Sequence, residues 1–109
     1  MMYVDFEAGG KSYRLRLDTR STIALEKQLG CNPLAIFGNG DEMPQITTLV
    51  QVLYCSMLPL NHGISLDEAY NIFDRYLEDG NAATDFLSVV IDVFKVSGLI
   101  KADKVNEKN

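Results

Sequence analysis

The sequence predicts an α+β fold that is mostly α, with an N-terminal β-hairpin packed on a bundle of about four helices. Apolar and polar residues alternate around a Gly-Gly pair near the N-terminus, which is typical of a hairpin. From residue 46 onward, apolar residues recur at helical spacing between turn signals. The chain has 109 residues, of which 47% are hydrophobic, so it is long enough for one buried core.

The expected hairpin turns at Gly9-Gly10 and has one apolar and one charged face. A two-stranded hairpin is only marginally stable alone in water, so we expect helices to cover its apolar face. Arg14, Arg16 and Arg20 are too few for a basic patch, and we assign them to a solvated face. The apolar face should carry Val4, Phe6, Ala8, Tyr13, Leu15 and Leu17.

A first helix should follow the hairpin and end at Gly30, where glycine allows a left-handed stop. Its N-cap is one of Asp18, Thr19 and Ser21. Residues 32–38 begin with Asn-Pro and end with Gly, which indicates one short helical turn. Residues 38–45 are rich in Gly, Asn and Asp and predict an exposed loop.

Three longer helices are expected in the second half of the chain. Pro44 opens the first of them, over 46–58. Ser65 and Glu68 form a capping-box pattern, which opens the next helix and lets it run to Gly80.

The last helix, over 85–97, should be capped by Thr84 and is apolar on most sides. Such a helix is either central to the core or partly covered by a partner. We expect one domain over 1–100, followed by a flexible polar tail over 101–109.

The charge distribution bears on the kind of partner. The net charge is −5, and residues 41–94 hold nine acidic residues against Arg75 alone. An acidic surface repels phosphate, so we expect no nucleic-acid binding.

The sequence has no apolar run of membrane-spanning length and no pattern of a secretory signal, which favours a cytoplasmic location.

Nothing in the sequence supports an enzyme, a cofactor or a metal site. His62 is the sole histidine, and neither Cys31 nor Cys55 has a spacing that brings it to a base. Asp74 and Glu78 are four residues apart on one helix face, but no further ligands converge on them. The glycines match no phosphate-binding loop. The composition instead favours a small acidic interaction domain.

Two stretches resemble the small tail assembly chaperones of long-tailed phages and prophages of Gram-positive bacteria. The first is Leu25-Glu-Lys-Gln-Leu-Gly-Cys-Asn-Pro-Leu34, and the second is His62-Gly-Ile-Ser-Leu-Asp67. The likeness extends over about residues 10–100. It implies a non-enzymatic protein of the host cytoplasm that binds the tape measure protein, a long helical apolar chain, and keeps it soluble while tail tube protein polymerises around it.

The partner-binding residues are a hypothesis of their own, because no motif of the resemblance supplies them. We nominate five apolar positions of the last helix and its flank: Phe86, Val90, Phe94, Leu99 and Ile100. For each of Phe86, Val90 and Phe94, a place in the core is the more frequent role. Alanine at Leu99 and Ile100 should weaken partner binding with little change in melting temperature.

Several alternatives stay open. The chain can be a structural tail-completion or connector protein, or an unrelated cytosolic adaptor that binds a helix. An unfilled apolar groove can be covered by a second copy, so the sequence also allows a homo-oligomer. Chaperones of this kind are often made in two lengths by ribosomal frameshifting, and Glu107-Lys108-Asn109 can be encoded by a slippery A-rich run.

Overall fold

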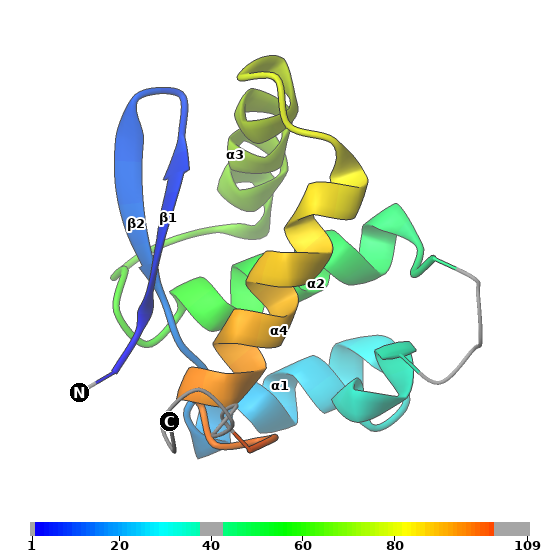
Figure 1. Ribbon diagram of the computed structural model, residues 1–109. Helices are drawn as coiled ribbons and strands as arrows, with labels where there is room; N and C mark the ends of the chain where they lie inside the picture. Colours follow the sequence, from blue (N-terminus) through cyan, green and yellow to red (C-terminus); the bar gives the residue numbers. More distant parts are fainter. Residues whose placement is uncertain (1, 38–42, 102–109) are drawn as a thin grey trace, which may run out of the picture.

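The computed structural model describes residues 2–37 and 43–101 (Figure 1). The hairpin and the helices confirm the predicted α+β, mostly α fold. Most of the expected loop over 38–45, the tail beyond residue 101 and Glu107-Lys108-Asn109 lie outside the described residues. The elements are β1 (Val4–Ala8), β2 (Lys11–Leu15), α1 (Thr19–Leu29), the 3₁₀ helix η1 (Pro33–Phe37), α2 (Ile46–Met57), α3 (Leu66–Glu78), the 3₁₀ turn η2 (Ala83–Asp85) and α4 (Phe86–Val96).

The hairpin has the register that the alternating sequence predicts. β1 and β2 pair antiparallel, with Phe6 opposite Tyr13 and Asp5 opposite Arg14. Both turn residues have positive φ, 59° at Gly9 and 80° at Gly10, a conformation that favours glycine and suits a two-residue turn. Helices α3 and α4 contact β1, and α2 contacts β2, so the apolar face is covered as expected.

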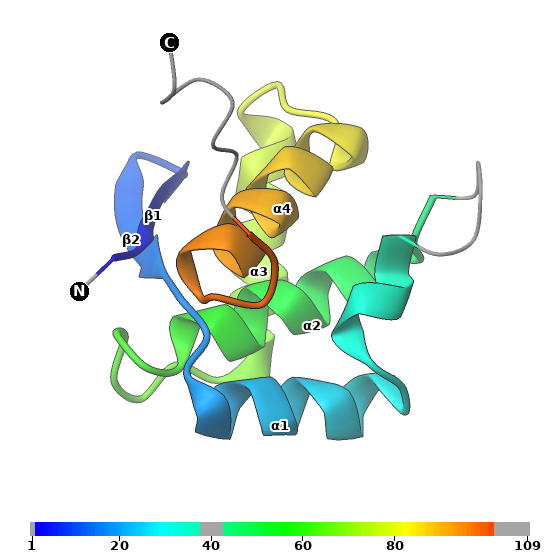
Figure 2. The same cartoon turned by 60° about the horizontal axis from the view of Figure 1, so that its bottom comes forward.

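Helix α2 is the central element of the fold. It contacts α1, α3, α4 and β2, and Figures 1 and 2 show it between α1 on one side and α3 and α4 on the other. Eight of its 12 residues are buried, against four of the 11 in α4. The sequence allowed the last helix to be either central to the core or partly covered by a partner, and the central place belongs to α2 instead. The apolar character of the two helices is similar, and only the tertiary packing decides which one is enclosed.

Aromatic rings join the hairpin to the helices that cover it. The Phe6 ring lies 5.6 Å from Phe86 and 5.0 Å from Tyr76, measured between ring centroids. Phe73 meets Phe86 edge-on at 5.4 Å. This geometry is favourable for aromatic pairs and connects β1, α3 and α4 in one part of the core.

The helix ends follow the expected capping pattern with one exception. Asp18, among the three candidates, caps α1 and accepts a hydrogen bond from the Ser21 amide at 2.8 Å. The Ser65–Glu68 capping box of α3 is formed. The predicted cap at Thr84 is wrong, because a 3₁₀ turn precedes α4 and the Asp85 carboxylate accepts from the Ala82 amide at 2.8 Å.

Arg16 joins the N-terminal segment to the end of α4, and the expectation of a solvated side chain is wrong for it. Its Nη1 donates to the carbonyl of Val96 at 2.8 Å and to that of Met2 at 2.9 Å. Val96 is the last residue of α4, where carbonyl groups lack partners within the helix and a positive charge is favourable. The adjacent Leu17 amide donates to Ser97 Oγ at 2.8 Å.

Replacing Arg16 should therefore destabilise the fold. Arg16→Met keeps most of the aliphatic stem and removes both hydrogen bonds, so we expect a loss of about 1–3 kcal/mol in the free energy of unfolding. Urea unfolding followed by circular dichroism measures it. Arg20→Met, at an exposed position of α1, is the control and should change stability little. Equal losses in the two variants would contradict this role of Arg16.

The Asp18 cap should make stability depend on pH. Hydrogen bonds from the Ser21 backbone and side chain lower the pKa of Asp18 below its ordinary value of 3.8. The stabilisation is then fully present above pH 3.8 and is lost as the pH falls through the lowered pKa of the folded state. Asp18→Ala should cost about 0.5–2 kcal/mol at pH 7.

Asp18→Asn is the matched comparison, because asparagine caps a helix without titrating. As the pH falls from 7 to 3, the wild-type protein should lose unfolding free energy relative to this variant. A difference between the two proteins that stays constant over this range would exclude a role for the Asp18 charge.

Candidate apolar binding groove beside the first turn of α2

The structure places the five nominated residues in two different environments. Phe86, Val90 and Phe94 are 1%, 0% and 0% exposed, so the expectation that they form an exposed partner surface is wrong for these three. They lie on the face of α4 that packs into the core. Leu99 and Ile100 are partly buried and pack against the core from the segment after α4.

The segment after α4 is held in place by backbone hydrogen bonds. Gly98 has φ 81°, and the Leu99 amide donates to the Phe94 carbonyl at 2.9 Å. Leu99 also lines a hollow of about 430 Å³ between the start of α1 and the end of α4, in which Ile23 is 46% exposed. Leu99 therefore keeps access to a surface, whereas the three α4 residues do not.

A different group of apolar side chains is exposed near the start of α2, and no pattern in the sequence predicts it. These side chains come from η1, from α2 and the residues before it, and from the facing turn of α3. Apolar exposure of this kind is typical of interaction sites when it is contiguous. The exposed residues are Leu34 (39%), Phe37 (42%), Met43 (38%), Ile46 (50%) and Tyr70 (47%).

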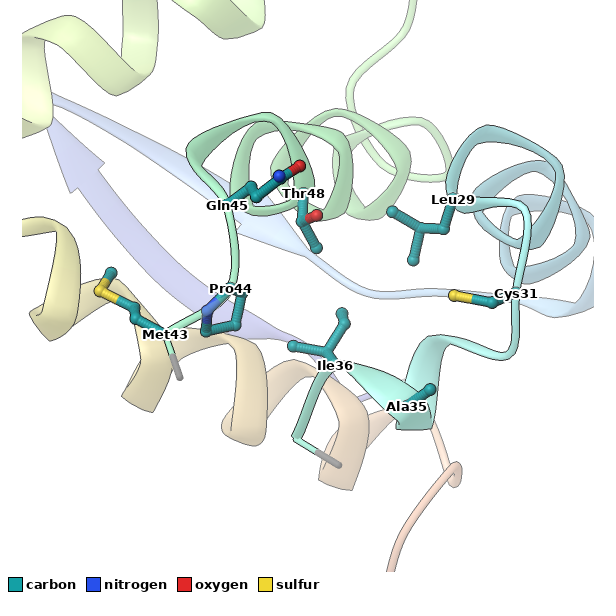
Figure 3. Close-up of a pocket in the computed structure, with 8 residues that line it drawn as sticks. All are labelled: Leu29, Cys31, Ala35, Ile36, Met43, Pro44, Gln45 and Thr48. Atoms are coloured by element: carbon teal, nitrogen blue, oxygen red, sulfur yellow. The ribbon is translucent and has the colours of Figure 1, made fainter. Parts of the chain in front are cut away.

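Two hollows flank the first turn of α2, each of about 270 Å³. One lies between the end of α1, η1 and the start of α2 (Figure 3). Met43, Pro44 and Ile36 contribute apolar lining there, while Gln45 and Thr48 add polar groups. Cys31, an exposed free cysteine, lies at the α1 side of this hollow.

The second hollow lies between α2 and α3, and we call it the α2–α3 groove. It is defined by Ile46, Thr47, Val50, Tyr70, Phe73 and Asp74. Val50 and Phe73 are 5% and 3% exposed and belong to the core, whereas Ile46 and Tyr70 are half exposed. The groove thus combines a fixed apolar floor with two accessible apolar side chains and one carboxylate.

Acidic side chains continue from the groove along the outer face of α3. Asp67, Asp74 and Glu78 are all exposed and follow one another at spacings of seven and four residues. Residues at such spacings lie along one face of a helix. We call these three residues the acidic ridge; Asp74 belongs to both the ridge and the groove.

The polar groups considered for chemistry do not form a reactive cluster in the described part of the chain. His62 is exposed in the turn before α3, whereas Cys55 is buried in α2. Burial raises the pKa of Cys55 to about 11, so its thiol stays protonated at neutral pH. Within residues 2–37 and 43–101, no three His, Cys, Asp or Glu side chains are placed to hold a metal ion.

Gln51 is a further buried polar residue that the sequence did not single out. It is 8% exposed on α2, and its side-chain oxygen has no hydrogen-bond partner among the described residues. Gln51 lines neither of the two hollows at the start of α2.

The described segments contain no helix that is both long and apolar enough to span a membrane. Comparison with curated proteins finds no match, and comparison with solved structures finds none either. A family of unknown function, DUF6096, matches residues 5–109, which is nearly the whole chain. The chain therefore belongs to the DUF6096 family.

Proposed function

We propose that this protein is a non-enzymatic tail assembly chaperone that binds the tape measure protein in the host cytoplasm. The proposed contact is an amphipathic helix of the tape measure protein lying in the α2–α3 groove. The observation that carries the proposal is the exposure of Ile46 and Tyr70 over the apolar floor of this groove. Resemblance to tail assembly chaperones adds the identity of the partner.

The groove suits the apolar stripe of a helix. In helix-in-groove recognition, side chains at positions i, i+3, i+4 and i+7 of the bound helix enter an apolar depression. Val50 and Phe73 form a floor held by the core, so little reorganisation is needed on binding. Ile46 and Tyr70 would lose their water contact when a helix covers them, which supplies the hydrophobic driving force.

The acidic ridge suits the polar flank of the same helix. A helix whose apolar stripe faces Ile46 and Tyr70 would bring its neighbouring positions toward Asp74. Basic residues at those positions would meet opposite charge, which raises the association rate and orients the helix. The partner segment should therefore carry Lys or Arg beside its apolar stripe.

The two motifs that support the resemblance belong to other parts of the fold. The first runs from the end of α1 into η1, next to the hollow at the start of α2, and the second forms the turn and capping box before α3. Each precedes an element that contributes exposed apolar side chains. The residues of the two motifs thus help to position η1 and α3.

Substitutions in the groove should weaken partner binding without unfolding the protein. We expect Ile46→Ser together with Tyr70→Ala to reduce affinity for the tape measure protein at least about tenfold, because both side chains would anchor the helix. Both positions are about half exposed, so each substitution should lower the free energy of unfolding by about 1 kcal/mol or less. Co-expression with the tape measure protein of the same phage, followed by affinity capture, provides the first readout, and titration with fluorescent segments of it provides the affinity.

Ile23→Ser is the matched control, because Ile23 is 46% exposed on α1 and lies outside the groove. Leu99→Ala tests the surface nominated from the sequence. Loss of binding in Leu99→Ala with full binding in the groove variant would move the site to the hollow after α4. Failure of the wild-type protein to bind or solubilise the tape measure protein would overturn the proposed function. Binding of unrelated amphipathic helices alone would favour the adaptor alternative.

A further inference from the structure

We infer that the hollow between β2 and α3 is a carboxylate-binding site, separate from the α2–α3 groove and independent of the proposed function. It has a volume of about 400 Å³. It lies on the other side of α3 from the groove, and the two share no lining residue. Its lining residues are Lys11, Tyr13, Ile64, Glu68, Asn71, Ile72 and Arg75.

Hydrogen-bond donors dominate this hollow. Lys11 and Arg75 bring two positive charges, and Tyr13 and Asn71 bring a hydroxyl and an amide. None of these four side chains takes part in a hydrogen bond with another described residue, whereas the neighbouring Glu68 does. A site with several unused donors selects a ligand with acceptors and negative charge.

Arg75 is the strongest indication of a built site. It is the sole basic residue between Lys27 and Lys95, in a region where acidic residues dominate. Its aliphatic stem lies against the hairpin turn: a Cβ at Gly9 would lie 2.6 Å from Arg75 Cδ and 3.3 Å from its Cγ. The Gly9 amide also donates to the Asp79 carboxylate at 2.9 Å, which holds the turn against α3. Figure 1 shows the hairpin turn beside the end of α3.

The charge of the lining favours a carboxylate over a phosphate. Lys11 and Arg75 together exceed Glu68 by one positive charge, which matches a singly charged anion. Glu68, whose Oε1 accepts from the Ser65 amide and hydroxyl, places a carboxylate beside the hollow and disfavours a dianion. The planar guanidinium of Arg75 can bind both oxygens of a carboxylate, and Lys11 adds a point charge.

Titration of the labelled protein followed by NMR tests this site. The probes are the peptide acetyl-Gly-Glu-Gly-amide, its Gln counterpart, sodium acetate and inorganic phosphate. We expect the Glu peptide to shift the amides of Gly9, Lys11 and Asn71 and the Arg75 Nε–H signal in a saturable way, with no saturable shift from the Gln peptide. Saturation by acetate at similar concentrations would assign the site to small carboxylic acids, and weaker acetate binding would assign it to peptide side chains.

Variants test whether binding depends on the side chains of this hollow or only on the positive charge of the protein. Lys11→Gln with Arg75→Gln should weaken binding of the Glu peptide at least about tenfold, and Arg75→Lys should lie between this variant and the wild type. Arg20→Gln with Lys27→Gln removes the same charge from α1 and should leave binding intact. Equal weakening in this control, tighter binding of phosphate than of the Glu peptide, or no saturable shift in the wild-type protein would each overturn the inference.

Discussion

The burial of α2 is the constraint on which the rest of the structure depends. This helix presents apolar side chains in nearly every direction, and its removal from water requires elements on all sides. The hairpin, α1, α3 and α4 each cover part of it and are thereby placed relative to one another. Its first turn is the exception, since Ile46 is half exposed there. The two hollows flank that turn, so the surface proposed for partner binding lies where neighbouring elements no longer cover α2 completely.

Polar contacts determine the relative orientation of segments, which burial of apolar surface alone does not specify. Hydrophobic packing is not directional, whereas the bonds from Arg16 to Met2 and Val96 specify how the N-terminal segment meets the end of α4. The hydrogen bond from the Gly9 amide to the Asp79 carboxylate does the same for the hairpin turn and α3. Both contacts join positions that are distant in the sequence, and both link the N-terminal part of the chain to a helix end.

Local sequence signals predicted most of the elements, and tertiary packing decided the rest. The Gly9-Gly10 turn, the stop at Gly30 and the Ser65 capping box depend on a few adjacent residues and could be predicted. The central place of α2, the burial of Phe86, Val90 and Phe94, and the role of Arg16 depend on which faces meet, which periodicity does not specify. The α2–α3 groove could not be foreseen for the same reason, because Ile46 and Tyr70 come from different helices. The cap predicted at Thr84 failed because the adjacent Asp85 competes for the same turn.

Amide hydrogen exchange, with and without a tape measure segment, tests the central claim most directly. That claim is that α2 is enclosed by the fold along most of its length and open to a partner at its first turn. In the free protein, exchange should be slowest over residues 49–57, because only global unfolding exposes them. Added tape measure segment should slow exchange at the first turn of α2 and in α3 around Tyr70, with no comparable change in α1. Fast exchange over 49–57, or new protection confined to α1 and the segment after α4, would contradict the account.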